Sequence, residues 1–259
     1  MGKPYRLAFL SLYLPIACAA QTPAVITVPG IKTEVVPSKI FGPGVGSFLV
    51  TNESQIAITA MHFTFGCYTP KQMQNSIFDS LLYVPDRPIE PQQNRTSRFG
   101  SQEIPTCPSG VDAAMFADGH VEGDPKAIDK IYSWRRGFDK GITFAIPLVA
   151  AIAQSEGERS HAVTSLAEKS NQVNQDLAVD VDERMAEVFL LRTVIECLQK
   201  EQQLGTPSDR TRAREPNVGD VMRAENLDHT QAVAYVLGRK LTEWKSDLIG
   251  HLTTPSGKQ

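Results

Sequence analysis

The sequence lacks an apolar run as long as the roughly 20 residues that a helix needs to span a bilayer. Its mainly apolar stretches, Leu7–Ala17 and Ile142–Ala153, are both shorter than that. We therefore expect no transmembrane span in the mature chain. The second stretch is predicted to be a buried helical segment.

Motifs of common enzyme chemistries are also absent. The chain has no Gly-x-Ser-x-Gly elbow, no His-Glu-x-x-His zinc motif and no phosphate-binding loop. No two histidines have the spacing that places metal ligands on one helix face. The five are His62, His120, His161, His229 and His251. These absences favour a non-enzymatic protein without a cofactor.

A basic stripe is the third absence. The chain has 26 Lys and Arg against 29 Asp and Glu, a formal net charge of -3, and its basic residues are scattered. Binding to a phosphate backbone requires clustered positive charge. No nucleic-acid partner is predicted.

The features that are present begin with an export signal. Lys3 and Arg6 precede the apolar stretch Leu7–Ala17, and small residues follow it, which is the order of a secretory signal peptide. We predict cleavage after Ala20, or after the neighbouring Ala19, so that residues 1–20 are removed and the product is periplasmic or secreted. Loss of the two basic residues changes the net charge from -3 to -5.

A lipid anchor is the alternative at the same place. Ile16-Ala17-Cys18 resembles the end of a bacterial lipobox, in which the cysteine is lipidated, although Pro15 departs from that motif. One acyl chain binds a membrane only marginally, so a stable anchor would need the several chains of a lipoprotein. Lipidation of Cys18 would make the protein a membrane-anchored lipoprotein.

The composition changes near Asp124. Residues 21–123 carry 15 charged side chains and 10 prolines, whereas residues 124–259 carry 38 and 5. Short β-branched runs broken by Pro and Gly predict strands in the first region, and helical spacing predicts helices in the second. We expect an α+β fold with a β-domain at 21–123 and a helical region at 124–259.

The first region is predicted to be a β-sandwich. Val45–Thr51 and Ile56–Phe65 flank the turn-forming residues of Asn52-Glu-Ser-Gln55, a pattern typical of a β-hairpin. Further strands are expected at Ile31–Val36, Ser80–Val84, Thr96–Glu103 and Val111–Ala117. This number of short strands favours a two-sheet sandwich of the immunoglobulin or fibronectin kind, with a small barrel as the alternative.

The second region is predicted to hold three helical stretches. One begins at Asp124-Pro125, a capping residue and a first-turn proline. It is either one long helix or two nearly collinear helices, and Gly137, Gly141 and Pro147 are the places for a break or kink. Another spans Val181–Gln203, and the last spans Asp220–Ile249; a polar mobile loop is expected at 205–216. The expected apolar faces are Met185, Val188, Phe189, Val194, Ile195 and Leu198 in one, and Val233, Leu237, Leu241, Trp244 and Leu248 in the other.

Three cysteines remain after export. Cys67 and Cys107 are predicted to form a disulfide because export leads to an oxidising compartment. Closing a loop of that length stabilises a fold by about 4 kcal/mol. Cys197 lies among apolar positions of a predicted helix, so it is expected to be a buried, unreactive thiol.

The segment Asp118 to Asp124 is the strongest candidate for a metal site. In an extended chain, Asp118, His120, Glu122 and Asp124 would project on one face and could bind a divalent cation. The competing interpretation is structural: Asp118-Gly119 forms a hairpin turn, and Asp124 caps the next helix. The spacing matches neither an EF-hand nor a zinc motif.

Three further motifs fit ligand binding or covalent modification. Trp134-Arg135-Arg136 could bind an anionic ligand or form an amphipathic helix face. Asn52-Glu-Ser54 and Asn94-Arg-Thr96 fit the N-glycosylation pattern, which matters only in a eukaryotic source.

Leu49-Val-Thr-Asn-Glu-Ser-Gln-Ile-Ala-Ile-Thr-Ala60 and Ala114-Met-Phe-Ala-Asp-Gly-His-Val-Glu-Gly-Asp124, together with the export signal, resemble uncharacterised exported proteins of soil bacteria of the acidobacterial type. The resemblance covers about residues 45–140. It implies a bacterial envelope setting and a β-sandwich followed by helices. It implies no activity and no functional residues.

The first functional hypothesis is therefore an exported structural or protein-interaction module of the cell envelope. The second is an exported metal-dependent hydrolase that uses the Asp118–Asp124 segment. The third is a carbohydrate-binding module that presents Phe63, Phe65 and Tyr68 to sugars, although these residues fit a core equally well.

Overall fold

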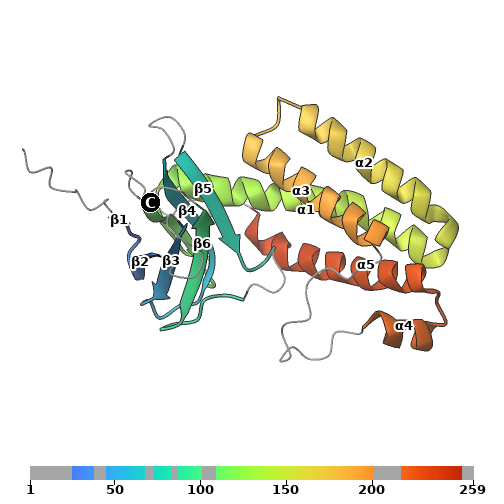
Figure 1. Cartoon of the computed structure of the whole chain (residues 1–259), viewed down its shortest axis with the longest axis horizontal. Coiled ribbons are helices and arrows are strands. Elements are labelled where there is room, and N and C mark those ends of the chain that lie inside the picture. The colour runs from blue at the N-terminus through green and yellow to red at the C-terminus, as the bar shows by residue number, and fades with distance from the viewer. Residues whose placement is uncertain are drawn as a thin grey trace, which may run out of the picture.

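The computed structural model describes residues 25–37, 45–67, 73–82, 87–100, 109–200 and 217–252. The predicted signal peptide with Cys18, the predicted loop at 205–216 and Cys107 lie outside these residues, as does the side chain of Cys67. The described strands gather at one end of the molecule and the helices at the other (Figure 1). The fold is α+β.

The strands form two sheets. The small sheet has the order β2-β3-β6, and the large sheet has the order β1-β7-β4-β5 with β8 also paired to β7. All pairings are antiparallel except that of β1 with β7. The bounds are β1 (Val25–Ile26), β2 (Ile31–Pro37), β3 (Val45–Asn52), β4 (Ile58–Cys67), β5 (Met73–Asp79), β6 (Asn94–Gly100), β7 (Ser109–Phe116) and β8 (Val121–Gly123).

The predicted hairpin is wrong, because its two strands lie in different sheets. β3 pairs with β2 and β6, whereas β4 pairs with β5 and β7. The buried Asn52 side chain redirects the chain: its Nδ2 donates to the carbonyl oxygens of Ile56 at 2.8 Å and Ile89 at 2.7 Å. A buried asparagine held in this way is also no acceptor for a glycan.

The strands predicted near β2, β6 and β7 are confirmed, and the one at Ser80–Val84 is wrong. Ser80 to Leu82 form a turn after β5 instead. The Asp79 side chain accepts a hydrogen bond from the Leu81 amide at 3.0 Å, and the Ser80 amide donates to the Thr59 carbonyl at 2.8 Å. These local bonds end the strand.

The large sheet is covered on both faces. One face shares an apolar cluster with the small sheet, to which Val50 of β3 and Met61 and Phe63 of β4 belong. The other face packs Ala60 and Met115 against the first turns of α1 (Pro125–Gln154). The large sheet therefore lies between the small sheet and the N-terminal part of α1.

Helix α1 is one continuous helix that runs from the sheets into the helical region (Figure 1). Its predicted cap is confirmed, since Asp124 accepts a hydrogen bond from the Lys126 amide at 3.1 Å. Of the two alternatives, one long helix is confirmed, and the glycines do not break it. They allow close packing of α3 (Val181–Lys200) instead. A Cβ at Gly137 would lie 2.0 Å from the Glu183 carbonyl oxygen, and one at Gly141 would lie 2.8 Å from Leu190 Cδ2.

The other helices pack around α1. Helices α3 and α5 (His229–Leu248) both lie along it, α2 (Arg159–Gln175) packs on α3, and α4 (Val218–Glu225) packs on α5 (Figure 1). Short 3-10 turns follow α1 at Glu156–Glu158 and α5 at Ile249–His251. Within the described residues, no helix combines the length and apolar character needed to cross a bilayer.

Two predictions for the helical region need correction. Helix α2 was not predicted, because only Ala162, Leu166 and Val173 supply its buried apolar surface. The single helix predicted at 220–249 is two helices: Asn226 ends α4 in the left-handed conformation at φ 53°, and Asp228 begins α5 with a capping box.

Candidate functional site

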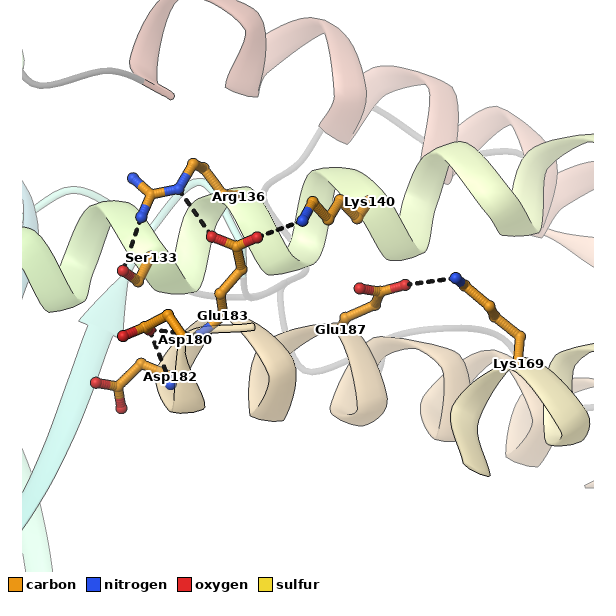
Figure 2. A network of polar contacts seen from close by, with 8 residues as sticks. All are labelled: Ser133, Arg136, Lys140, Lys169, Asp180, Asp182, Glu183 and Glu187. Carbon is orange, nitrogen blue, oxygen red and sulfur yellow. Dashed lines mark hydrogen bonds and ion pairs between the residues drawn. The ribbon is translucent and has the colours of Figure 1, made fainter. Parts of the chain in front are cut away.

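A polar network joins α3 to α1 and α2 (Figure 2). Glu183 of α3 accepts hydrogen bonds from Arg136 Nε at 2.9 Å and from Lys140 Nζ at 2.5 Å. Arg136 also donates to Ser133 Oγ at 2.8 Å. Although burial alone would raise the pKa of Glu183, these two cations together hold it below its ordinary value. Glu183 is therefore a charged anchor between α3 and α1.

Glu187 lies one turn further along α3 and is less well paired. Its side chain is 6% exposed, and its carboxylate lies 3.7 Å from Lys169 Nζ of α2 (Figure 2). Burial raises the pKa of Glu187, and the charges of Lys169 and Lys140 offset that shift only in part. The two glutamates thus have similar burial but opposite pKa shifts.

A groove of about 680 Å³ adjoins this network. Its lining includes Lys140, Phe144, Lys169, Val173, Val179 and Glu187. The charged residues of the lining are Lys140, Lys169, Asp139, Asp176 and Glu187, so both signs of charge border the groove. A second groove of about 610 Å³ lies between α1, α4 and α5, and its lining includes Ala150, Leu227, Ala234, Tyr235 and Gly238.

The polar network also fixes which face of α3 points outward. Residues two positions apart on a helix lie about 200° apart around its axis. Since Glu183 and Glu187 point toward α1 and α2, Met185 points away from both helices. Phe189 lies at the edge of this outward face, with its ring beside those of Trp134 and Phe138 of α1. The apolar face predicted for α3 is therefore wrong at Met185 and Phe189, which are 56% and 45% exposed.

The outward face carries a row of apolar side chains at every fourth position. It consists of Val181, Met185 and Phe189 of α3, preceded by Leu177 in the turn between α2 and α3, and we call these four residues the α3 row; Leu177 and Val181 are 84% and 51% exposed. At its C-terminal end, the Phe189 ring lies 6.4 Å from the ring of Trp134 and 6.0 Å from that of Phe138. Phe189 therefore connects the row to aromatic side chains of α1, of which Phe138 is buried in the core.

The candidate metal ligands have other roles in the structure. Phe116 and His120 close a turn around Asp118-Gly119, so β7 and β8 form a hairpin. The Asp118 side chain accepts from the His120 amide at 3.0 Å, and His120 Nε2 lies 2.8 Å from Glu122 Oε1. The turn removes the alternation on which the metal hypothesis depends. No group of three potential ligands converges within the described parts of the chain.

The Trp134-Arg135-Arg136 patch is not available to a ligand. Arg135 is buried and donates from Nε and Nη2 to the two carboxylate oxygens of Asp79, at 2.6 and 3.2 Å. Burial raises the pKa of Asp79, and the guanidinium opposes that shift. This pair ties the end of β5 to α1.

His62 of β4 is buried. Its Nδ1 lies 2.6 Å from Asp112 Oδ1, and Thr64 Oγ1 donates to Asp112 Oδ2 at 2.6 Å. His62 Nε2 is buried and has no hydrogen-bond partner among the described residues. His62 does not line either of the two grooves described above.

Of the two predictions about cysteines, the structure tests the one for Cys197 and not the Cys67–Cys107 disulfide. Cys197 is buried and free, as predicted, and burial raises its pKa to about 11. The disulfide between Cys67 and Cys107 stays a prediction, because it falls outside the described side chains. Of the predicted sugar-binding aromatics, Phe63 is a buried core residue.

The chain matches no protein-family model, and comparisons with curated proteins and with solved structures found no match either.

Proposed function

We propose that this chain is an exported, non-enzymatic protein of the cell envelope that binds another protein molecule through the α3 row. One observation carries the proposal: the row places large apolar side chains in solvent along one face of α3 and in the turn just before it. Single exposed apolar residues are normal, but a contiguous set marks an interaction surface.

The concentration of these side chains supports that interpretation. Five large apolar side chains are exposed in the described residues, and four of them belong to the row; the fifth is Ile249. Aromatic and methionine side chains are also enriched in protein interfaces. Met185 and Phe189 supply both kinds.

The location rests on the N-terminal sequence. Its basic and then apolar order supports export to the periplasm or the exterior, and Ile16-Ala17-Cys18 offers a lipid anchor as the alternative. The resemblance to acidobacterial exported proteins supports the same envelope setting.

We also propose that the two sheets form a sandwich of the immunoglobulin or fibronectin kind. Strands A, B and E of that fold share one sheet, and strands C, F and G share the other. Assigning β2, β3 and β6 to A, B and E, and β4, β7 and β8 to C, F and G, satisfies both sheets. In this assignment β3 and β4 are strands B and C, which lie in different sheets of the immunoglobulin fold, as β3 and β4 do here. An experimental structure with different strand pairing would contradict the assignment.

Crosslinking in intact cells tests the proposed function. The full chain, Met185→Arg and a control, Glu168→Arg, would be expressed in the native host, because Glu168 is exposed on α2 away from the row. We expect a crosslinked partner with the wild type and the control, and its loss with Met185→Arg. The intact mass of the recovered protein would report cleavage, lipidation and the Cys67–Cys107 disulfide.

The absence of any crosslinked species in all three strains, together with a monomeric purified protein, would contradict the proposed function. The hydrolase and sugar-binding alternatives draw no support from the geometry of Asp118–Asp124 or from the buried Phe63. Metal content of protein purified without chelators tests the hydrolase directly.

A further inference from the structure

We propose that the α3 row binds the α3 row of a second copy of this chain, in an antiparallel pair with its two-fold axis near Met185. This inference rests on the proposed function and names the partner. A pair of this kind is isologous, so each surface element meets its symmetry mate and the assembly closes as a dimer.

The spacing of the row suits such a pair. Side chains four residues apart form a ridge along a helix, and two such ridges interdigitate when the helices cross at about -50°. With Met185 at the axis, Val181 of each copy lies opposite Phe189 of the other. A small side chain therefore faces a large one on both sides of the axis, which favours close packing.

The charges along α3 select a second copy and the antiparallel direction. The exposed Asp176 and Asp180 lie beside the N-terminal end of the row and outnumber the one cation that the described residues place there, Arg184, which donates to the Asp176 carbonyl oxygen at 2.9 Å. The exposed Arg192 lies beyond the C-terminal end of the row. Arg192 forms no ion pair with any described residue. In the antiparallel pair Arg192 approaches the acidic end of its partner, whereas a parallel pair would place the two arginines together.

The polar network holds α3 in the same orientation in each copy before the two copies associate. Asp180 accepts hydrogen bonds from the Asp182 and Glu183 amides at 3.0 and 3.2 Å, which fixes the acidic end of the row. Glu183 holds α3 against α1, so rotation of the row is restricted before association. Less ordering is then needed at the interface, which favours binding.

The dimer is expected to be weak. A stable interface covers about 800 Å² on each partner, and one helical row offers less than that. We therefore expect a dissociation constant in the micromolar range or above, about 1 μM or weaker.

Sedimentation equilibrium of the mature full chain tests the association. We expect a concentration-dependent dimer for the wild type and for Glu168→Arg, and a monomer for Met185→Arg because it buries two facing charges at the axis. Arg192→Glu should weaken dimerisation about tenfold, since it replaces an attraction with a repulsion. Because all three side chains are outside the core, circular dichroism should show an intact fold for each variant.

Thiol crosslinking tests the register. Met185→Cys alone should crosslink to its own copy across the axis with a short bis-maleimide. A mixture of Val181→Cys and Phe189→Cys chains should form mixed dimers in preference to either like pair. Preferential like pairs would instead show a parallel arrangement and overturn the proposal.

A wild-type monomer at millimolar concentration with no crosslinking of Met185→Cys would also overturn it. That result leaves the proposed function intact if intact-cell crosslinking still captures a different protein and Met185→Arg removes it. Loss of both self-association and capture refutes both proposals.

Discussion

Helices α3 and α5 are both 20 residues long and both pack along α1, but they distribute their apolar residues differently. In α5 the apolar stripe is buried, as the sequence predicts; it comprises Val233, Leu237, Leu241, Trp244 and Leu248. In α3 Glu183 and Glu187 are buried instead, and Met185 and Phe189 face solvent. Helical spacing alone therefore does not identify the core-facing side.

The difference has a physical cause in the partner surface. Where α3 approaches α1, the opposing side chains include Arg136 and Lys140, whose charges are matched by Glu183. Gly137 and Gly141 bring the two backbones close at the same place. A buried polar contact thus orients α3, and the apolar residues left outside are available for association.

The largest expected effect is on the free energy of unfolding, and it distinguishes the buried α5 stripe from the exposed α3 row. Leu241→Ala on α5 should lower the free energy of unfolding by about 2–5 kcal/mol, because it leaves a cavity in the core. Met185→Ala on α3 should change it by less than about 0.5 kcal/mol, because the side chain is exposed. Urea denaturation of dilute protein measures both. Equal losses would mean that the row belongs to the core.

An intermediate effect should separate the two buried glutamates. Glu183→Gln should cost about 1 kcal/mol, a value reduced by the partial exposure of Arg136 and Lys140.

Glu187→Gln is the matched control for that change. It should alter the free energy of unfolding by less than about 0.5 kcal/mol, since Lys169 is 3.7 Å away and 30% exposed, so it can remain hydrated alone. The same urea titration at neutral pH compares the variants. A larger loss for Glu187→Gln would reverse the assigned roles.

The pH dependence of stability should differ in sign between the same two residues. The pKa of Glu183 is lowered in the fold, so its contribution is present above the ordinary value of 4.5 and is lost as the pH falls through the folded value. The pKa of Glu187 is raised, so its contribution is present below 4.5 and is lost as the pH rises through the folded value. Stability differences between the wild type and each Gln variant, followed across this range, should therefore have opposite slopes.

Local signals explain which parts of the fold were predictable. Asp124-Pro125 carries its own capping chemistry, and the start of α1 is confirmed. Four residues of the α5 stripe, Leu237, Leu241, Trp244 and Leu248, pack into one apolar cluster with residues of α1 and α3, so the stripe follows simple helical spacing. The hairpin prediction failed because the bonds of Asn52 to Ile89 depend on a residue 37 positions away.

The ion pairs of the candidate site could not be predicted from local sequence, because their partners are even further apart along the chain. Nothing in the sequence links Glu183 to Arg136, which precedes it by 47 residues, or Asp79 to Arg135, which follows it by 56. One signal was available: acidic residues at positions 183 and 187 are a turn apart on a predicted helix, with basic residues at 136 and 140 on another. That matching spacing predicts an interhelical pairing only if the two helices are known to touch.

The smallest expected effect leaves stability unchanged and compares the two faces of α3 by thiol chemistry. Burial raises the pKa of Cys197 to about 11, so little thiolate exists and access is restricted. A disulfide reagent at about pH 8 should modify Cys197 slowly in the folded protein and rapidly in urea. In dilute Met185→Cys, the added thiol should react promptly, because position 185 faces solvent. If Cys197 and the added thiol at position 185 react at one rate in the folded variant, the two faces of α3 do not differ as described, and the basis for the α3 row is lost.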